Sequence, residues 1–162
     1  MTSKKASKRV LAIDPVWGGF GYAVMEGPER LVNWGLKGAK EDRRVRSVNQ
    51  VAGLLKRFDP QVLVVEDISG GLRHLETRDL IADFVEIARE RKIEAVFIRR
   101  QQVLKHFAPQ GTVSLEDIAA VLAKDFPGLA HRLPAPRKPW KHEARSIRIF
   151  SSIALALTYY AA

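Results

Sequence analysis

The chain has 162 residues, of which 46% are hydrophobic and 28% are charged, which is the balance of a water-soluble domain with a core. No apolar run reaches the roughly 18 residues that cross a bilayer, and the absence of cysteine excludes disulfides and thiolate metal sites. Twenty-seven Lys and Arg against 18 Asp and Glu give a net charge of +9 and a pI near 10.1. Such an excess attracts polyanions and favours a nucleic-acid partner, although a merely soluble basic protein would share it.

The two ends of the chain differ in composition. We expect residues 1–8 to be a disordered basic leader, because no apolar stretch of secretory length follows them. Residues 9–162 are expected to form a single domain, and the lack of cysteine suits a cytoplasmic protein.

Apolar runs and their periods predict strands and helices in a clear order. Residues 9–14 are apolar on both faces, which indicates a central strand, and Gly27-Pro28 is a turn signal between two antiparallel strands. Ser114 is a plausible N-cap for a later helix, and the proline-rich residues 127–141 are expected to be an exposed loop. The predicted strands lie at 9–14, 20–27, 29–36, 61–67 and 93–98, and the predicted helices at 42–58, about 75–91, 100–107, 114–126 and about 143–160.

This order predicts an α/β fold with a five-stranded mixed sheet, in which three antiparallel strands are followed by two parallel ones and helices flank the sheet. Because strand–helix–strand crossovers are parallel and right-handed, the strand at 61–67 should lie beside the strand at 9–14. Asp14 and Glu66 then end neighbouring strands at the edge where open α/β sheets bind their ligands.

Four segments carry a pattern that a known family shares: IDPVWGGFGYAV at 13–24, LVVED at 63–67, VLKHFAPQGTVSLEDIAAVLAKDF at 103–126 and RIFSSIALALTYY at 148–160. In this order they resemble the RuvC-like Holliday junction resolvases of the ribonuclease H-like superfamily. The resemblance covers almost the whole chain. It implies a ribonuclease H-like domain over 9–162 and a Mg²⁺-dependent endonuclease, often a homodimer, that cuts branched DNA in recombination and repair.

The resemblance also implies an active site with two Mg²⁺ or Mn²⁺ ions. Asp14 would bridge both ions, Glu66 would bind one from the neighbouring strand, and Glu143 would complete the set. Such ions prefer oxygen ligands, and a pair of them helps in-line attack on a phosphodiester. Two alternatives remain open: Asp14-Pro15 is also an ordinary turn opening, and Glu66 with Asp67 could mark where a strand meets solvent.

The last helix departs from the family pattern. Arg148 and Ser151 stand where the family has an acid or a His, and Arg148 would repel a metal ion. The nearby acid Glu143 would either complete the site or merely complement the positive N-terminus of the helix. The missing acid leaves open a binding protein on the same fold without catalysis, and an RNA-processing nuclease is a third reading.

A basic segment precedes the last helix. Lys and Arg can neutralise phosphates there, and the Trp140 indole can stack on an unpaired base. A second basic stripe on the helix at 42–58 is equally well explained as a solvated face. The nucleic-acid-binding candidates are Arg132, Arg137, Lys138, Trp140, Lys141, Arg145 and Arg148, and the second stripe comprises Arg43, Arg44, Arg46, Lys56 and Arg57.

The first loop offers two further features. Trp17 and Phe20 would be either base wedges or aromatic residues packed on the sheet. The lack of side chains at Gly18, Gly19 and Gly21 would let a phosphate backbone approach the edge of the sheet.

Overall fold

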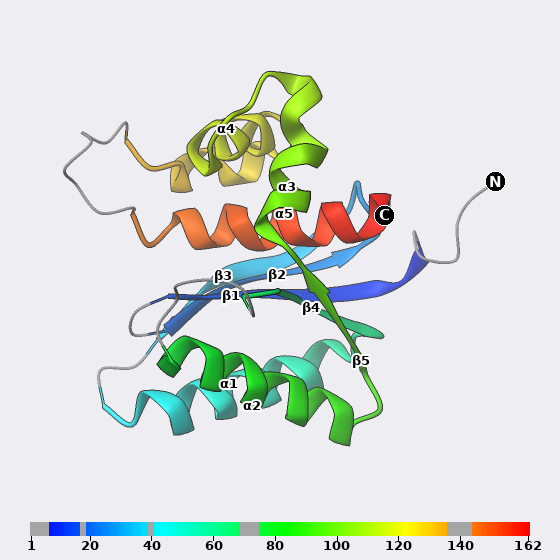
Figure 1. Cartoon of the computed structure of the whole chain (residues 1–162), viewed down its shortest axis with the longest axis vertical. Helices are drawn as coiled ribbons and strands as arrows, with labels where there is room; N and C mark the ends of the chain where they lie inside the picture. The colour runs from blue at the N-terminus through cyan, green and yellow to red at the C-terminus, as the bar shows by residue number, and fades with distance from the viewer. Residues whose placement is uncertain (1–6, 17–18, 39–40, 69–74, 136–143) are drawn as a thin grey trace.

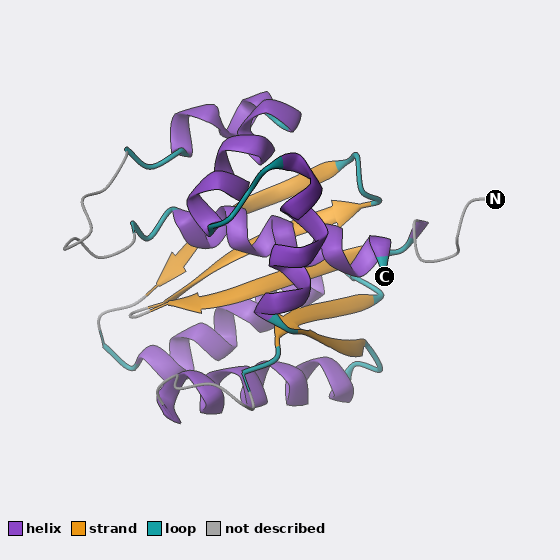
Figure 2. Cartoon of the chain, turned by 45° about the horizontal axis from the view of Figure 1, so that its top comes forward, coloured by secondary structure: helices purple, strands orange, loops and turns teal. Residues whose placement is uncertain are grey.

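A computed structural model describes residues 7–16, 19–38, 41–68, 75–135 and 144–162. Five strands form one sheet in the order β3-β2-β1-β4-β5, with β1 in the centre (Figure 2). β1 pairs antiparallel with β2 and parallel with β4, as predicted. The strands are β1 (Arg9–Val16), β2 (Gly19–Glu26), β3 (Leu31–Gly38), β4 (Val62–Glu66) and β5 (Glu94–Ile98).

Helices cover both faces of the sheet (Figure 1). On one face lie α1 and α2; on the other, α5 lies directly on the sheet, and α3 and α4 pack outside it. This position explains why α5 is apolar nearly all round, since almost all of its residues are buried. The helices are α1 (Arg43–Phe58), α2 (Leu75–Glu90), α3 (Arg100–Phe107), α4 (Leu115–Asp125) and α5 (Ile147–Ala161), with 3-10 turns at Ala108–Gln110 and Pro127–Arg132.

The alternation of β1 side chains divides the core into two halves. Val10 and Ala12 face α5, whereas Leu11 and Ile13 face α1 and α2, and all four are fully buried. Ser114 accepts a hydrogen bond from the backbone N–H of Asp117 (3.2 Å), which confirms the predicted N-cap of α4.

The segment before α5 differs from the sequence prediction. Part of the expected loop is the 3-10 helix Pro127–Arg132, because Leu129 inserts into the core and is fully buried. The last helix begins at Ile147 rather than near residue 143; residues 144–146 form tight turns whose carbonyls accept from Ile147, Arg148 and Ile149. Residues 1–6 of the predicted leader, and residues 136–143, lie outside the described part of the chain.

None of the helices in the described ranges is long and apolar enough to cross a membrane.

Candidate functional site

Asp14 lies near the carboxyl end of the central strand, and it is buried. Its side chain is only 2% exposed, at the place where the start of α5 crosses β1. Arg148 Nη1 donates to Asp14 Oδ2 at 3.1 Å, and the Ser151 hydroxyl donates to the same oxygen. The Arg148 side chain is 13% exposed. Asp14 and Arg148 therefore form an ion pair that is largely removed from water.

Gly21 allows α5 to approach this closely. It is the residue of β2 that pairs with Asp14, and a Cβ there would lie 2.5 Å from the Arg148 carbonyl carbon and 2.6 Å from its oxygen. Ser152 Oγ donates to that same carbonyl oxygen at 2.7 Å. The backbone of Arg148 is thus fixed against β2, and its guanidinium is directed to the end of β1.

The expected use of the glycines was therefore wrong for two of them. The space beside Gly21 is filled by α5, and a Cβ on Gly19 would lie 1.9 Å from the Lys37 carbonyl oxygen of β3. Both glycines serve the packing of the protein itself and leave no room there for a phosphate backbone. Gly18 lies outside the described residues.

Glu66 ends β4, next to the end of β1, as predicted. The register Ile13 to Val65 makes the two strands parallel neighbours, so Asp14 and Glu66 are at the same edge. Glu66 is partly exposed and lines a hollow of about 400 Å³ with Asp67, Phe97 and residues of α2. Asp67 also forms an ion pair with Arg99, at 3.8 Å.

The donor set that the structure describes does not fit a pair of Mg²⁺ ions at Asp14. Such a site needs several carboxylate oxygens directed at one point, and within the described ranges no group of three His, Cys, Asp or Glu side chains comes together. Asp14 Oδ2 already accepts from a guanidinium and a hydroxyl. The guanidinium would repel a second cation at that oxygen. A metal role for Asp14, Glu66 and Glu143 stays a prediction, and Glu143 lies outside the described residues, ahead of α5.

Three of the basic candidates lie in the described ranges. Arg145 is exposed in the turn before α5, and Arg132 places its guanidinium 5.7 Å from the ring centre of Trp34 on β3. Arg148 is the partner of Asp14. The candidates Arg137, Lys138, Trp140 and Lys141 lie outside the described residues, so nucleic-acid binding by this segment stays a prediction.

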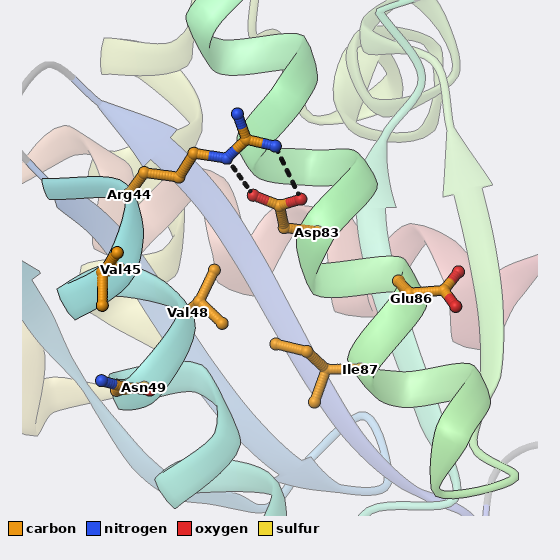
Figure 3. A pocket seen from close by; sticks show the side chains of 7 residues that line it. All are labelled: Arg44, Val45, Val48, Asn49, Asp83, Glu86 and Ile87. Carbon is orange, nitrogen blue, oxygen red and sulfur yellow. Dashed lines mark hydrogen bonds and ion pairs between the residues drawn. The ribbon is translucent and has the colours of Figure 1, made fainter.

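The second basic stripe is partly engaged in helix packing. Arg44 on α1 reaches Asp83 on α2 with two hydrogen bonds, of 2.6 and 3.0 Å (Figure 3). These bonds and the charge of Asp83 raise the pKa of Arg44 above its ordinary value. The pair spans a hollow of about 350 Å³ that Val48 and Ile87 also line (Figure 3). Arg44 therefore has a structural partner, which favours the solvated-face reading for this residue.

Phe20, one of the two aromatic candidates, belongs to the core. Phe20 is fully buried, with its ring centre 5.7 Å from that of Phe84 and 6.3 Å from that of Tyr22. It packs against the sheet and is not a base wedge. Trp17 lies outside the described residues.

Sequence reasoning did not foresee that Arg148 pairs with Asp14. The signal was present, because Arg148 and Ser151 are three residues apart and so lie on one face of a helix. A helix face that offers a cation and a hydroxyl complements a single buried carboxylate.

Comparison with known proteins identifies the fold. The sequence matches no family model and no curated protein. The structure is similar to Thermus thermophilus RuvC in complex with a Holliday junction substrate, with a TM-score of 0.69, 22% identity, and coverage of 95% of this chain and 94% of that one. It is also similar to the yeast mitochondrial Holliday junction resolvase Ydc2, with a TM-score of 0.61, 13% identity, and coverage of 95% of this chain and 78% of that one. The fowlpox virus resolvase in complex with Holliday junction DNA is similar too, with a TM-score of 0.56, 13% identity, and coverage of 94% of this chain and 97% of that one. The chain therefore has the ribonuclease H-like fold of RuvC and other Holliday junction resolvases.

Proposed function

We propose that this protein binds four-way DNA junctions at the carboxyl edge of its sheet and through the basic segment before α5, without cutting them by a two-metal reaction. The observation that carries the proposal is the fold match, over 95% of the chain, to a RuvC solved with its Holliday junction substrate. The net charge of +9 supports a polyanionic partner. The Asp14–Arg148 pair at the same edge argues against metal-dependent cleavage.

The affinity should come mostly from phosphate contacts. Arg145 and Arg132 are the described candidates, and both belong to the stretch between α4 and α5. Each phosphate that a cation neutralises adds about 0.9 to the slope of log affinity against log salt. The salt slope therefore counts the contacts, whereas the preference for a junction over a duplex measures recognition of shape.

Fluorescence anisotropy with a labelled four-way junction and a duplex of matched sequence tests this function. We expect tighter binding to the junction and a linear loss of affinity with log salt. Arg145→Ala should lower the slope by about 1. The matched control is Arg91→Ala, because Arg91 is exposed in the turn between α2 and β5, at the opposite edge of the sheet. Undetectable or salt-independent binding would contradict the proposal, and tighter binding of an RNA junction would replace DNA with RNA as the ligand.

A second candidate function is a Mg²⁺-dependent endonuclease that uses Asp14, Glu66 and Glu143. The position of Asp14 and Glu66 at the ends of adjacent parallel strands favours it. This function requires Arg148 to leave Asp14 when metal binds. If it holds, the protein cuts a labelled junction in Mg²⁺ or Mn²⁺, and Glu143→Gln abolishes cutting while Glu29→Gln, in the turn at the far edge, does not. Tight binding without any product in either metal would exclude it.

A homodimer is part of the proposal. The strands of a four-way junction are related in pairs, so two copies related by a two-fold axis would present equal surfaces to them. Light scattering with and without junction DNA checks this, and a protein that remains a monomer in the complex would contradict it.

A further inference from the structure

The cation that the fold family implies at Asp14 is supplied here by the chain itself. We propose that Arg148 takes the place of the metal at Asp14, so that Asp14 binds neither Mg²⁺ nor Mn²⁺ and its charge is already neutralised when DNA arrives. The statement about DNA rests on the proposed function, whereas the statement about metal does not.

The geometry of the pair supports this replacement. Arg148 Nη1 and the Ser151 hydroxyl both donate to Asp14 Oδ2, the first at 3.1 Å. An arginine guanidinium stays protonated throughout the physiological pH range, so the positive charge at this oxygen is permanent. A divalent ion would have to displace that charge from a carboxylate whose side chain is only 2% exposed.

The backbone holds Arg148 in this position independently of the charges. Gly21 leaves the space in which the Arg148 carbonyl lies, and Ser152 Oγ bonds that carbonyl at 2.7 Å. The neighbouring residues Ile149 and Phe150 are buried in the core that the sheet, α4 and α5 share. The guanidinium is therefore attached to a fixed point of the fold and not to a mobile surface turn.

The replacement has a consequence for DNA binding. An isolated carboxylate at the carboxyl edge would repel a phosphate, and in a metal-dependent enzyme the ions would remove that repulsion. Here Arg148 neutralises Asp14 directly. Junction binding should consequently need no divalent ion at this site.

Mn²⁺ binding to the protein alone tests the inference, by calorimetry and by broadening of the amide resonances of Ile13, Asp14 and Gly21. Adding Mn²⁺ to the wild-type protein should produce no heat of binding. The amide resonances of these three residues should not broaden. A Mn²⁺ signal there that Asp14→Asn removes would overturn the inference. Because no DNA is present, the outcome is independent of whether the protein binds junctions.

A pair of double variants then tests which residues exclude the metal. Arg148→Gln with Ser151→Asp removes the cation and adds a carboxylate, whereas Arg148→Gln with Ser151→Asn has nearly the same shape without the charge. We expect the aspartate variant to bind Mn²⁺ at least tenfold more tightly and to melt higher in its presence. A folded aspartate variant, verified by circular dichroism, that binds no better than the asparagine control would overturn the inference. If neither variant folds, the wild-type measurement decides alone.

Discussion

The two ends of α5 are attached to the sheet by different chemistry. At the start of the helix, Arg148 and Ser151 contact the buried carboxylate of Asp14. At its end, the buried Tyr160 hydroxyl accepts from the Gly27 N–H at 2.9 Å and lies within hydrogen-bond distance of the carbonyls of Lys8 (2.7 Å) and Met25 (3.1 Å). One end uses a charged pair and the other a neutral hydroxyl.

The two kinds of attachment differ in their desolvation cost. A neutral hydroxyl satisfies buried backbone groups at a small desolvation cost, as Tyr160 does at the end of α5. A buried ion pair is often no more stabilising than apolar residues of the same size, because both charges lose water. The charged end lies at the carboxyl edge of β1 and β4, which is the edge where open α/β sheets bind their ligands and where we propose that junctions bind.

The largest effect should come from separating Asp14 and Arg148. Asp14→Asn or Arg148→Gln removes one charge of the buried ion pair and leaves the other buried, which should lower the free energy of unfolding by about 3–5 kcal/mol. The double variant should lose clearly less stability than the two single variants lose together, because both charges are gone. Urea unfolding of the four proteins at neutral pH measures this coupling. Additive single losses would show that the two side chains do not interact.

The exposed pair Arg44–Asp83 is the matched control for the double-mutant cycle at Asp14 and Arg148. Its side chains are 60% and 26% exposed, and surface pairs of this kind contribute little to stability because water and salt screen them. Arg44→Gln should therefore change the unfolding midpoint only slightly. An equal loss at both pairs would mean that burial is not what distinguishes the Asp14 site.

Gly21→Ala tests the charged end from the other side of the contact. The new methyl would overlap backbone atoms of Arg148, so α5 must move away from β2. We expect Gly21→Ala to lower the free energy of unfolding by about 3 kcal/mol. This loss should be smaller when Arg148→Gln is already present. Gly53→Ala on α1, where a Cβ meets nothing within 4 Å, is the control and should be neutral or slightly stabilising. A harmless Gly21→Ala would contradict the close approach.

Tyr160→Phe tests the neutral end. It removes the hydroxyl that the Gly27 N–H donates to, and should lower the free energy of unfolding by about 1–2 kcal/mol. Junction binding, measured on the same samples, should be unchanged because the residue lies at the far end of α5. A change in junction affinity would show that the two ends are not separate in function.

The smallest effect is a pH dependence at the neutral end, where Tyr160 lies. Burial raises the pKa of Tyr160 to about 12, from an ordinary value of 10.0. The unfolded state therefore releases this proton first, and the stabilisation that Tyr160 provides is complete below about pH 10 and declines as the pH rises to about 12. Thermal melts across this range should show the wild-type advantage over Tyr160→Phe shrinking. A stability difference between the wild-type protein and Tyr160→Phe that stays constant across this pH range would show that the hydroxyl is not buried.

The sheet and its order could be predicted because their signals are local. Buried runs such as Val62–Val65 and turn signals such as Gly27-Pro28 each specify a strand or a connection, and crossover handedness places β4 beside β1. The same reasoning placed Asp14 and Glu66 at one edge. The start of α5 was less predictable, because the turns at residues 144–146 are set by hydrogen bonds and not by an apolar period.

The contact between Asp14 and Arg148 is harder to predict, because it joins residues at opposite ends of the chain and the helix-face signal of Arg148 and Ser151 does not name their partner. Its existence depends on how closely α5 approaches β2, and that distance is set by the missing side chain of Gly21. Read along the sequence, Gly21 suggested room for a ligand. In the fold, the same room is filled by the backbone of Arg148.

A crystal of the protein soaked in Mn²⁺ and measured at the manganese absorption edge would show directly whether a metal ion binds at Asp14. We expect no anomalous peak near Asp14 and a guanidinium of Arg148 within hydrogen-bond distance of Asp14 Oδ2, as in the present structure. An anomalous peak bound by Asp14 and Glu66, with Arg148 turned away from the carboxylate, would contradict it.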